Sequence, residues 1–260
     1  APHWIADRQT GAQILKFGTE KQKQSILPRI AAGRCYTCVG MSEPQAGSDL
    51  AAVTTKATKT SSGWSLSGRK IWSTVGHISN YMIVLARTSP AEGKNRHAGL
   101  SQFLVNLTLS GIGISGIRDI AGHTHFNEVV FDDVKLTRDD LLGEEGNGWA
   151  QCMGELALER SGPERFLTTF LLIERALAEL PAAFPPATVG ELIARVTTLR
   201  IMSRGIALRL QAGEHPDTEA ALVKQLGNAF EKHLFSAVRG IIGAYPEAQM
   251  PAGLLRLRDE

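Results

Sequence analysis

The sequence contains little cysteine, and this limits its redox chemistry. Only three cysteines, Cys35, Cys38 and Cys152, occur in 260 residues. That number does not build a disulfide framework and favours a reducing compartment. Cys35 and Cys38 have the spacing of a redox pair, but strand-like sequence follows them. Because no helix N-terminus is there to activate the first thiol, we do not interpret the pair as a redox site.

Strong charge bias and long apolar runs are also missing. Lys and Arg number 28 against 26 Asp and Glu, a net charge of +2, so we expect no nucleic-acid partner. No apolar run reaches the roughly 18 residues that a membrane span needs, and no signal-peptide pattern opens the chain. We therefore expect no membrane span, with the cytoplasm as the default location.

The spacing of apolar residues changes twice along the chain. Helical spacing predicts a helical segment over 1–35 that stops near Gly33. Alternating runs, two of them joined by the hairpin signal at 61–63, predict an all-β, barrel-like domain over 36–140. Helical spacing then returns and predicts a C-terminal helical bundle over 141–260. The predicted fold class is α+β with several domains.

Three short patterns look like known sites, and each has a simpler interpretation. "GIGISG" at 111–116 matches G-x-G-x-x-G, but a poor helix follows it, so we interpret it as a turn at a strand end. His123 and His125 would share one face of a strand, but no third ligand is suitably spaced, so no metal site is predicted. Ser161 lacks the flanking glycines of a nucleophile elbow and is interpreted as a helix cap, in a capping box with Glu164.

Glu159 is the acidic residue that stands out. It lies on an otherwise apolar predicted helix, with Leu156 and Leu158 beside it. A carboxylate among apolar groups has its charged form disfavoured and its basicity raised, as a catalytic base requires. The alternative is a glutamate at the edge of a helix, paired with Arg160.

The stretch "GMSEPQAGSDL" at 40–50 places small polar residues where a strand ends. Ser and Gly at such a position can leave backbone N–H groups open to an anionic group, and Pro44 fixes the turn. The loop therefore suits a phosphate or the polar edge of a ring.

Several motifs occur in one order: "MSEPQAGSD" (41–49), "SGRKIWST" (67–74), "FNEVVFDDVKL" with "LLGEEGNGWAQ", and "LALERSG" (156–162). In these motifs and in its helix–β–helix layout the sequence resembles the acyl-CoA dehydrogenase family. The resemblance implies a flavoprotein with FAD in its β domain and an acyl-CoA substrate. It also implies an electron-transfer flavoprotein as electron acceptor and a homo- or hetero-oligomer.

The resemblance also implies roles for single residues. It places eight residues at the cofactor: Val39, Met41, Ser42, Gly47, Ser48, Trp72, Ser73 and Thr74. Gly47 and Ser48 would lie between the flavin and the CoA part of the substrate, while Thr74 would bond near the flavin N5. It places three residues at the substrate: Ser48, Leu158 and Arg160.

In the family reaction a carboxylate takes the α-proton of the thioester and the flavin takes the β-hydride. Members similar to isovaleryl- and long-chain acyl-CoA dehydrogenases carry this base on the first helix after the β domain, in an L-E-R setting. Glu159 occupies that position and is the expected catalytic base. Bases there occur in members acting on branched or bulky chains.

The chain departs from the family pattern in three places. Most of the N-terminal helical domain is not recognised, and the sequence stops before the family's C-terminal G-T-x-E-I loop. "LPAAFPPATVGELIARV" stands where the family has R-x-x-F-G, whose arginine reaches the partner subunit's FAD. The missing arginine segment allows one alternative, a non-catalytic or half-site subunit of a hetero-oligomer. An acyl-CoA oxidase is a further alternative, which differs in whether oxygen reaches the reduced flavin.

Overall fold

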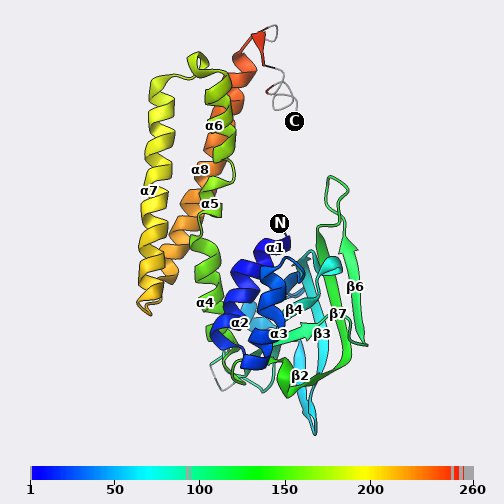
Figure 1. Cartoon of the computed structure of the whole chain (residues 1–260). Coiled ribbons are helices and arrows are strands. Elements are labelled where there is room, and N and C mark those ends of the chain that lie inside the picture. Colours follow the sequence, from blue (N-terminus) through cyan, green and yellow to red (C-terminus); the bar gives the residue numbers. More distant parts are fainter. Residues whose placement is uncertain (1, 92, 94, 247–248, 252–253, 255–260) are drawn as a thin grey trace. The chain divides into compact units, whose positions relative to one another are not determined.

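The computed structural model (Figure 1) describes residues 2–91, 93, 95–246, 249–251 and 254. Helices precede and follow one sheet, which is the α+β arrangement that the sequence predicts. The chain forms two compact units, residues 1–155 and 156–260. The finer division at 35/36 and 140/141 stays a prediction.

The first unit begins with four short helical elements: α1 (Pro2–Trp4), the π-helix η1 (Ile5–Gly11), α2 (Ala12–Phe17) and α3 (Glu20–Ala31). Helix α3 starts at a capping box, in which Thr19 and Gln22 each bind the other's backbone N–H. It ends as predicted near Gly33, whose φ of 68° is the left-handed conformation that glycine adopts without strain.

Eight strands form one sheet: β1 (Thr37–Gly40), β2 (Lys56–Thr60), β3 (Gly63–Thr74), β4 (Tyr81–Arg87), β5 (Leu100–Asn106), β6 (Ile112–Ile117), β7 (Phe126–Thr137) and β8 (Leu141–Leu142). Their order is β6-β7-β3-β2-β4-β5-β8, and β1 pairs in parallel with β4. The predicted hairpin is confirmed, because β2 and β3 pair antiparallel around a turn at 61–62.

Strand β4 is buried on both faces and carries the core of the first unit. Met82 and Val84 pack with Phe103 in the cluster inside the sheet. Ile83, which points to the opposite face, packs with Ile26 of the N-terminal helices, and these lie beside the sheet in Figure 1. The buried run explains why this strand reads as continuously apolar rather than alternating.

The interpretation of 111–116 as a turn is wrong. The turn comes earlier, at Gly111, whose φ is 88°. Residues 112–117 then form strand β6, antiparallel to β7. Ile112 and Ile114 are partly buried against the core, and this alternation keeps the segment extended. No helix follows it, so the dinucleotide interpretation stays rejected.

Helices make up the second unit. Helix α4 (Gly148–Ser161) starts in the first unit, and α5 (Glu164–Leu167), α6 (Phe170–Glu179), α7 (Pro186–Gln211) and α8 (Asp217–Ala244) follow it. Figure 1 shows α7 (yellow) and α8 (orange) side by side, and α8 also packs against α5 and α6. The predicted capping box at Ser161 is wrong, because Ser161 still belongs to α4 and α5 has no side-chain cap.

Short 3-10 turns complete the chain: η2 (Leu50–Ala52), η3 (Gly76–Ile78), η4 (Arg138–Asp140) and η5 (Pro181–Ala183). Turns η2 and η3 follow the two motif segments, 41–49 and 67–74.

Candidate functional site

The first motif segment leaves β1 through a tight turn. The N–H of Glu43 donates to the Ala46 carbonyl at 2.8 Å, and the Ala46 N–H donates back to the Glu43 carbonyl at 3.0 Å. Pro44 follows Glu43 inside this turn, where its fixed φ suits the second turn position, as the sequence predicts. The turn gives the loop a fixed path as it leaves the sheet.

A buried ion pair joins the two motif segments. Lys70 Nζ donates to Glu43 Oε1 at 2.9 Å and to the Met41 carbonyl at 3.0 Å. The side chains of Lys70 and Glu43 are 0% and 1% exposed. The carboxylate also accepts bonds of 2.7–2.9 Å from Gln45, Thr54 and Thr55. Each buried charge is therefore compensated, as burial requires.

The ion pair sets the charge of both partners. Burial favours a higher pKa for Glu43, but the Lys70 charge and the hydrogen bonds outweigh it and lower that pKa to about 2. Burial lowers the pKa of Lys70 to about 8, against the attraction of Glu43. Both groups are charged at neutral pH.

The sequence interpretation missed this pair, although it contains a signal. Positions 66, 68 and 70 share one face of β3, and Leu66 on that face is fully buried. A lysine on an inward face requires an acidic partner, and a nearby motif offers Glu43. The motif segments drew attention to ring-facing residues instead.

The second motif segment ends in a bulge. The register of β3 against β7 shifts between Lys70 and Ser73. Within the bulge, the Ile71 N–H donates to the Ser42 carbonyl at 3.0 Å. Trp72 has a φ of 61° and is 56% exposed, with its ring edge-on to Phe126 at a centroid distance of 6.0 Å. The bulge thus turns a large aromatic side chain outward beside the first motif segment.

Two buried polar atoms beside the bulge have no hydrogen-bond partner among the described residues. They are Ser73 Oγ and Asn127 Nδ2, and the two residues oppose each other in the register of β3 and β7. Both residues are 0% exposed. Buried polar groups in native proteins are normally satisfied, so open ones need an explanation. Because both atoms are closed to solvent, a ligand on the exposed face of Trp72 would not contact them directly.

The structure brings together some of the predicted site residues. Met41 and Ser42 are tied to β3 beside Trp72 by the bonds given above. Val39 lies half-buried in β1, paired with Ile83, and Thr74 lies half-buried opposite Phe126. Gly47 and Ser48 are exposed on the loop after the tight turn. The cofactor contacts of all eight residues stay predictions.

Glu159 lies near the end of α4, in the second unit. Its carboxylate forms an ion pair with Arg165, whose Nε also donates to the Glu159 carbonyl at 3.0 Å. The partner is therefore Arg165 rather than Arg160, because α4 ends at Ser161 and the chain then brings residue 165 back to residue 159. The carboxylate is 18% exposed. Arg160 is half-buried, and the side chain of Leu158 lies outside the described residues.

The cysteines are buried, and His123 is exposed. Cys35, Cys38 and Cys152 are buried free thiols, and burial raises the pKa of Cys38 and of Cys152 to about 12. His123 faces Asp119 at 3.8 Å on an exposed loop. The part of the chain that the structure describes contains no cluster of three His, Cys, Asp or Glu that could hold a metal ion.

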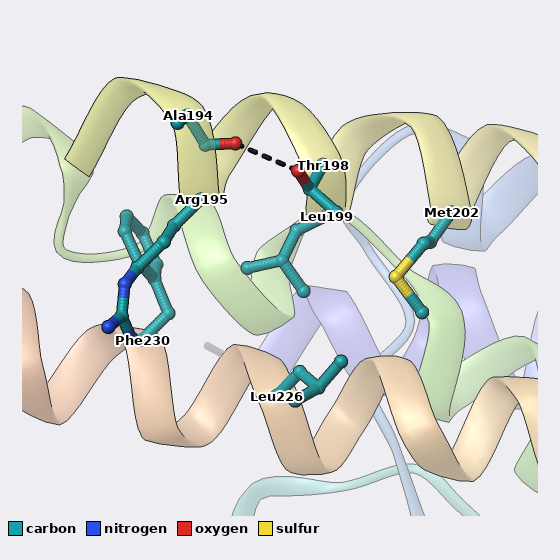
Figure 2. Close-up of a pocket in the computed structure, with 7 residues that line it drawn as sticks. All are labelled: Ala194, Arg195, Thr198, Leu199, Met202, Leu226 and Phe230. Atoms are coloured by element: carbon teal, nitrogen blue, oxygen red, sulfur yellow. Dashed lines mark hydrogen bonds between the residues drawn. The ribbon is translucent and has the colours of Figure 1, made fainter. Parts of the chain in front are cut away.

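The second unit contains a cavity of about 240 Å³ between α7 and α8. Figure 2 shows Leu199 and Met202 of α7 above Leu226 of α8, with Arg195 and Phe230 at one end. Thr198 points its hydroxyl back to the Ala194 carbonyl at 2.9 Å rather than into the cavity. The lining is mostly apolar, so this cavity offers few polar groups to a charged cofactor.

Comparison with known proteins identifies the family. The model of the acyl-CoA dehydrogenase middle domain matches residues 38–134, which include both motif segments. The chain is 37% identical to the acyl-CoA dehydrogenase IpdE1 of Mycobacterium tuberculosis over 251 residues, or 94% of this chain and 64% of that protein. It is 38% identical to the mitochondrial long-chain specific acyl-CoA dehydrogenase of Sus scrofa, over 56% of this chain and 34% of that one. The chain thus spans less than two thirds of either relative.

Solved structures share the fold. The butyryl-CoA dehydrogenase of Megasphaera elsdenii matches 97% of this chain and 69% of its own, at 25% identity and a TM-score of 0.72. An acyl-CoA dehydrogenase of Geobacillus kaustophilus matches 98% and 71%, at 24% identity and a TM-score of 0.79. No helix among the described residues has the length and apolar character needed to cross a bilayer. The chain belongs to the acyl-CoA dehydrogenase family.

Proposed function

We propose that the protein catalyses the FAD-dependent α,β-dehydrogenation of an acyl-CoA thioester. The observation that carries the proposal is the junction of the two motif segments. There the exposed Trp72 stands beside a loop that hydrogen bonds hold to β3, with the half-buried Thr74 two positions further on. Family membership supports the same activity, and the relatives' names give it for those proteins.

These residues fit the isoalloxazine ring of FAD. Trp72 offers an apolar face, and Met41 and Ser42 offer backbone groups. Thr74, half-buried at the end of β3, offers a hydroxyl to a polar edge of the ring. When bound, FAD supplies the hydride acceptor.

Glu159 is the proposed base. Its carboxylate takes the α-proton. The electron pair of that α C–H bond forms the new α,β double bond as the β-hydride leaves. Arg165 binds Oε1, so we assign the proton to Oε2. Arg165 also binds the Glu159 carbonyl, and this second bond limits rotation of the carboxylate relative to the helix.

Glu159→Gln tests this assignment. We expect turnover to fall about 10²- to 10⁴-fold, the usual contribution of a general base, while the bound flavin keeps its absorption spectrum. Glu179→Gln is the matched control, because Glu179 is also a helical glutamate paired with an arginine, Arg175, at 2.8 Å. If Glu159→Gln retains activity within a few-fold of the parent, the base is another residue.

The expected partners are an electron-transfer flavoprotein and further subunits. Helices α7 and α8 expose several large apolar side chains: Ile193, Ile201, Leu208, Leu222, Leu226 and Phe235. Solvent-facing apolar residues on two long helices favour burial against another subunit. Gel filtration with mass measurement should show a self-associated species. A monomer that binds flavin only with a second chain would favour the half-site alternative.

The absorption spectrum of the purified protein tests the cofactor and the reaction class. Bands of oxidised flavin that bleach anaerobically with one acyl-CoA from a panel would support the proposal. Rapid reoxidation of that flavin by oxygen would instead identify an acyl-CoA oxidase. A colourless protein that stays colourless with added FAD would refute a self-sufficient dehydrogenase.

A further inference from the structure

We propose that Lys70 is a positioning residue that fixes the Met41–Ser42 peptide against the flavin. The inference rests on the proposed function, and it assigns a role to a residue outside the predicted site. Lys70 makes no proposed contact with FAD or substrate. It acts through the backbone of the first motif segment.

The geometry of the trans peptide carries the first step. No cis peptide occurs among the described residues, so the C=O of Met41 and the N–H of Ser42 point in opposite directions. Lys70 Nζ binds that C=O at 3.0 Å. The bond therefore fixes the Ser42 N–H on the side away from Lys70. In the proposed function, this is the side on which the flavin binds.

A second bond fixes the next peptide in the same way. The Ile71 N–H binds the Ser42 carbonyl at 3.0 Å, so two successive carbonyls are held by two successive residues of β3. Glu43 then binds its own turn through Ala46. Each of the three peptide units between Met41 and Pro44 is therefore held by at least one hydrogen bond.

Glu43 keeps Lys70 in place from the other side. Its carboxylate is held by the backbone N–H groups of Thr54 and Thr55 at 2.7 and 2.9 Å, so it is itself anchored. The lysine stem passes close to the backbone of β1, where a Cβ added to Gly40 would lie 3.1 Å from Lys70 Cγ. The stem, the ammonium group and the carboxylate thus form a rigid connection between β3 and the loop.

A purely stabilising role is the competing explanation. Replacing both members of a buried ion pair by neutral residues is often nearly neutral for stability. If the pair serves only stability, neutral residues should replace it without a local effect on the loop at 41–49. If the pair positions the loop, the same replacement should loosen the loop.

Two variants separate these roles. Lys70→Met with Glu43→Gln removes the bond to Met41 and leaves no unpaired charge, whereas Glu43→Gln alone leaves the buried ammonium without its carboxylate. Lys59→Met with Glu145→Gln removes an exposed pair of the same unit and serves as the control. For each protein we would measure the FAD dissociation constant and, without FAD, hydrogen exchange at the amides of Ile71 and Ile83.

We expect the Lys70→Met, Glu43→Gln variant to bind FAD about tenfold more weakly, the effect of about one hydrogen bond. Exchange at Ile71 should accelerate about tenfold while exchange at Ile83, in the core strand β4, stays unchanged. Glu43→Gln alone should destabilise the whole unit and accelerate exchange at both amides, because it leaves the Lys70 charge buried and unpaired. In the double variant, unchanged exchange at Ile71, or equal acceleration at Ile71 and Ile83, would overturn the proposal.

The two measurements also separate this inference from the proposed function. If the parent protein binds no FAD, the proposed function fails. The exchange contrast between Ile71 and Ile83 still decides whether Lys70 positions the loop. If FAD binds equally well to the parent and to the double variant, the positioning role fails and the dehydrogenase assignment stands.

Discussion

The buried carboxylate of Glu43 should make the stability of the protein depend on acid in a way that can be calculated. The pKa of Glu43 falls from 4.5 to about 2 on folding. Because the folded pKa is the lower one, this group contributes its full stabilisation above pH 4.5 and loses it as pH falls through 2. The shift corresponds to about 3 kcal/mol of unfolding free energy, of which about 2 kcal/mol is lost by pH 3.

Lys70 offsets this contribution at neutral pH. Burial lowers its pKa from 10.5 to about 8, so keeping the ammonium charged in the fold costs a comparable amount below pH 8. The pKa of the nearby Cys152 is raised to about 12 by burial, so this thiol stays neutral over the same range. At pH 7 the Lys70→Met, Glu43→Gln variant should therefore lie within about 1 kcal/mol of the parent.

Chemical denaturation at pH 6 and pH 3 measures the difference. Other carboxylates also titrate in this range, so the quantity to compare is the parent minus the double variant at each pH. We expect the parent to lose about 2 kcal/mol relative to the variant between the two pH values. Parallel losses in both proteins would refute the reasoning, because Glu43 would then not be ionised and paired in the fold.

Three further substitutions test the fold and the site. Gly68→Ala should lower the unfolding free energy by about 2 kcal/mol or more, because φ is 152° and the new Cβ would lie 2.7 Å from Thr55 Cα. The control is Gly205→Ala, in open space on α7, which should raise the unfolding free energy by up to about 1 kcal/mol. Trp72→Gly should leave stability unchanged or raise it by about 1 kcal/mol while weakening FAD binding in a fluorescence titration. Phe230→Ala should cost about 3–5 kcal/mol in thermal unfolding, and the exposed Phe235→Ala on the same helix should cost much less.

Much of the fold could be predicted from the sequence because apolar spacing is a local property. The hairpin at 61–62, strand β7 and helix α8 show the expected period, and strands β4 and β5 are short apolar runs of strand length. The errors lie where two local signals compete. Glycines at 111–116 suggested a turn, but cross-strand pairing with β7 keeps the segment extended. The spacing of Ser161 and Glu164 suggested a capping box, but α4 continues through Ser161.

The site was less predictable because its main contacts are long-range. The motifs marked the loop at 41–49 and the strand end at 67–74, and the structure joins them. The joining groups, Lys70 and Glu43, lie 27 positions apart in sequence, and a single sequence does not show which strands meet. In the same way the partner of Glu159 depends on how the chain reverses after Ser161. Adjacency in sequence favoured Arg160, whereas the fold selected Arg165.

Backbone strain gives an independent reason to place the site at the end of β3. Among the described residues, three that are not glycine have a positive φ: Trp72, Val75 and Asp133. Asp tolerates this conformation, and Asp133 lies in an exposed position with bonds to Ser65 and Lys135. An aromatic and a β-branched residue do not tolerate it well, and each costs on the order of 1–3 kcal/mol. These two follow Lys70 within five positions in sequence, and the buried ion pair of Lys70 itself adds little net stability. Strained residues, a charge pair of little net stability and polar atoms with no partner in the described part of the chain all occur at this strand end, and none of them favours stability. Such features gather at binding sites, so we expect the ligand to bind at the bulge of Trp72.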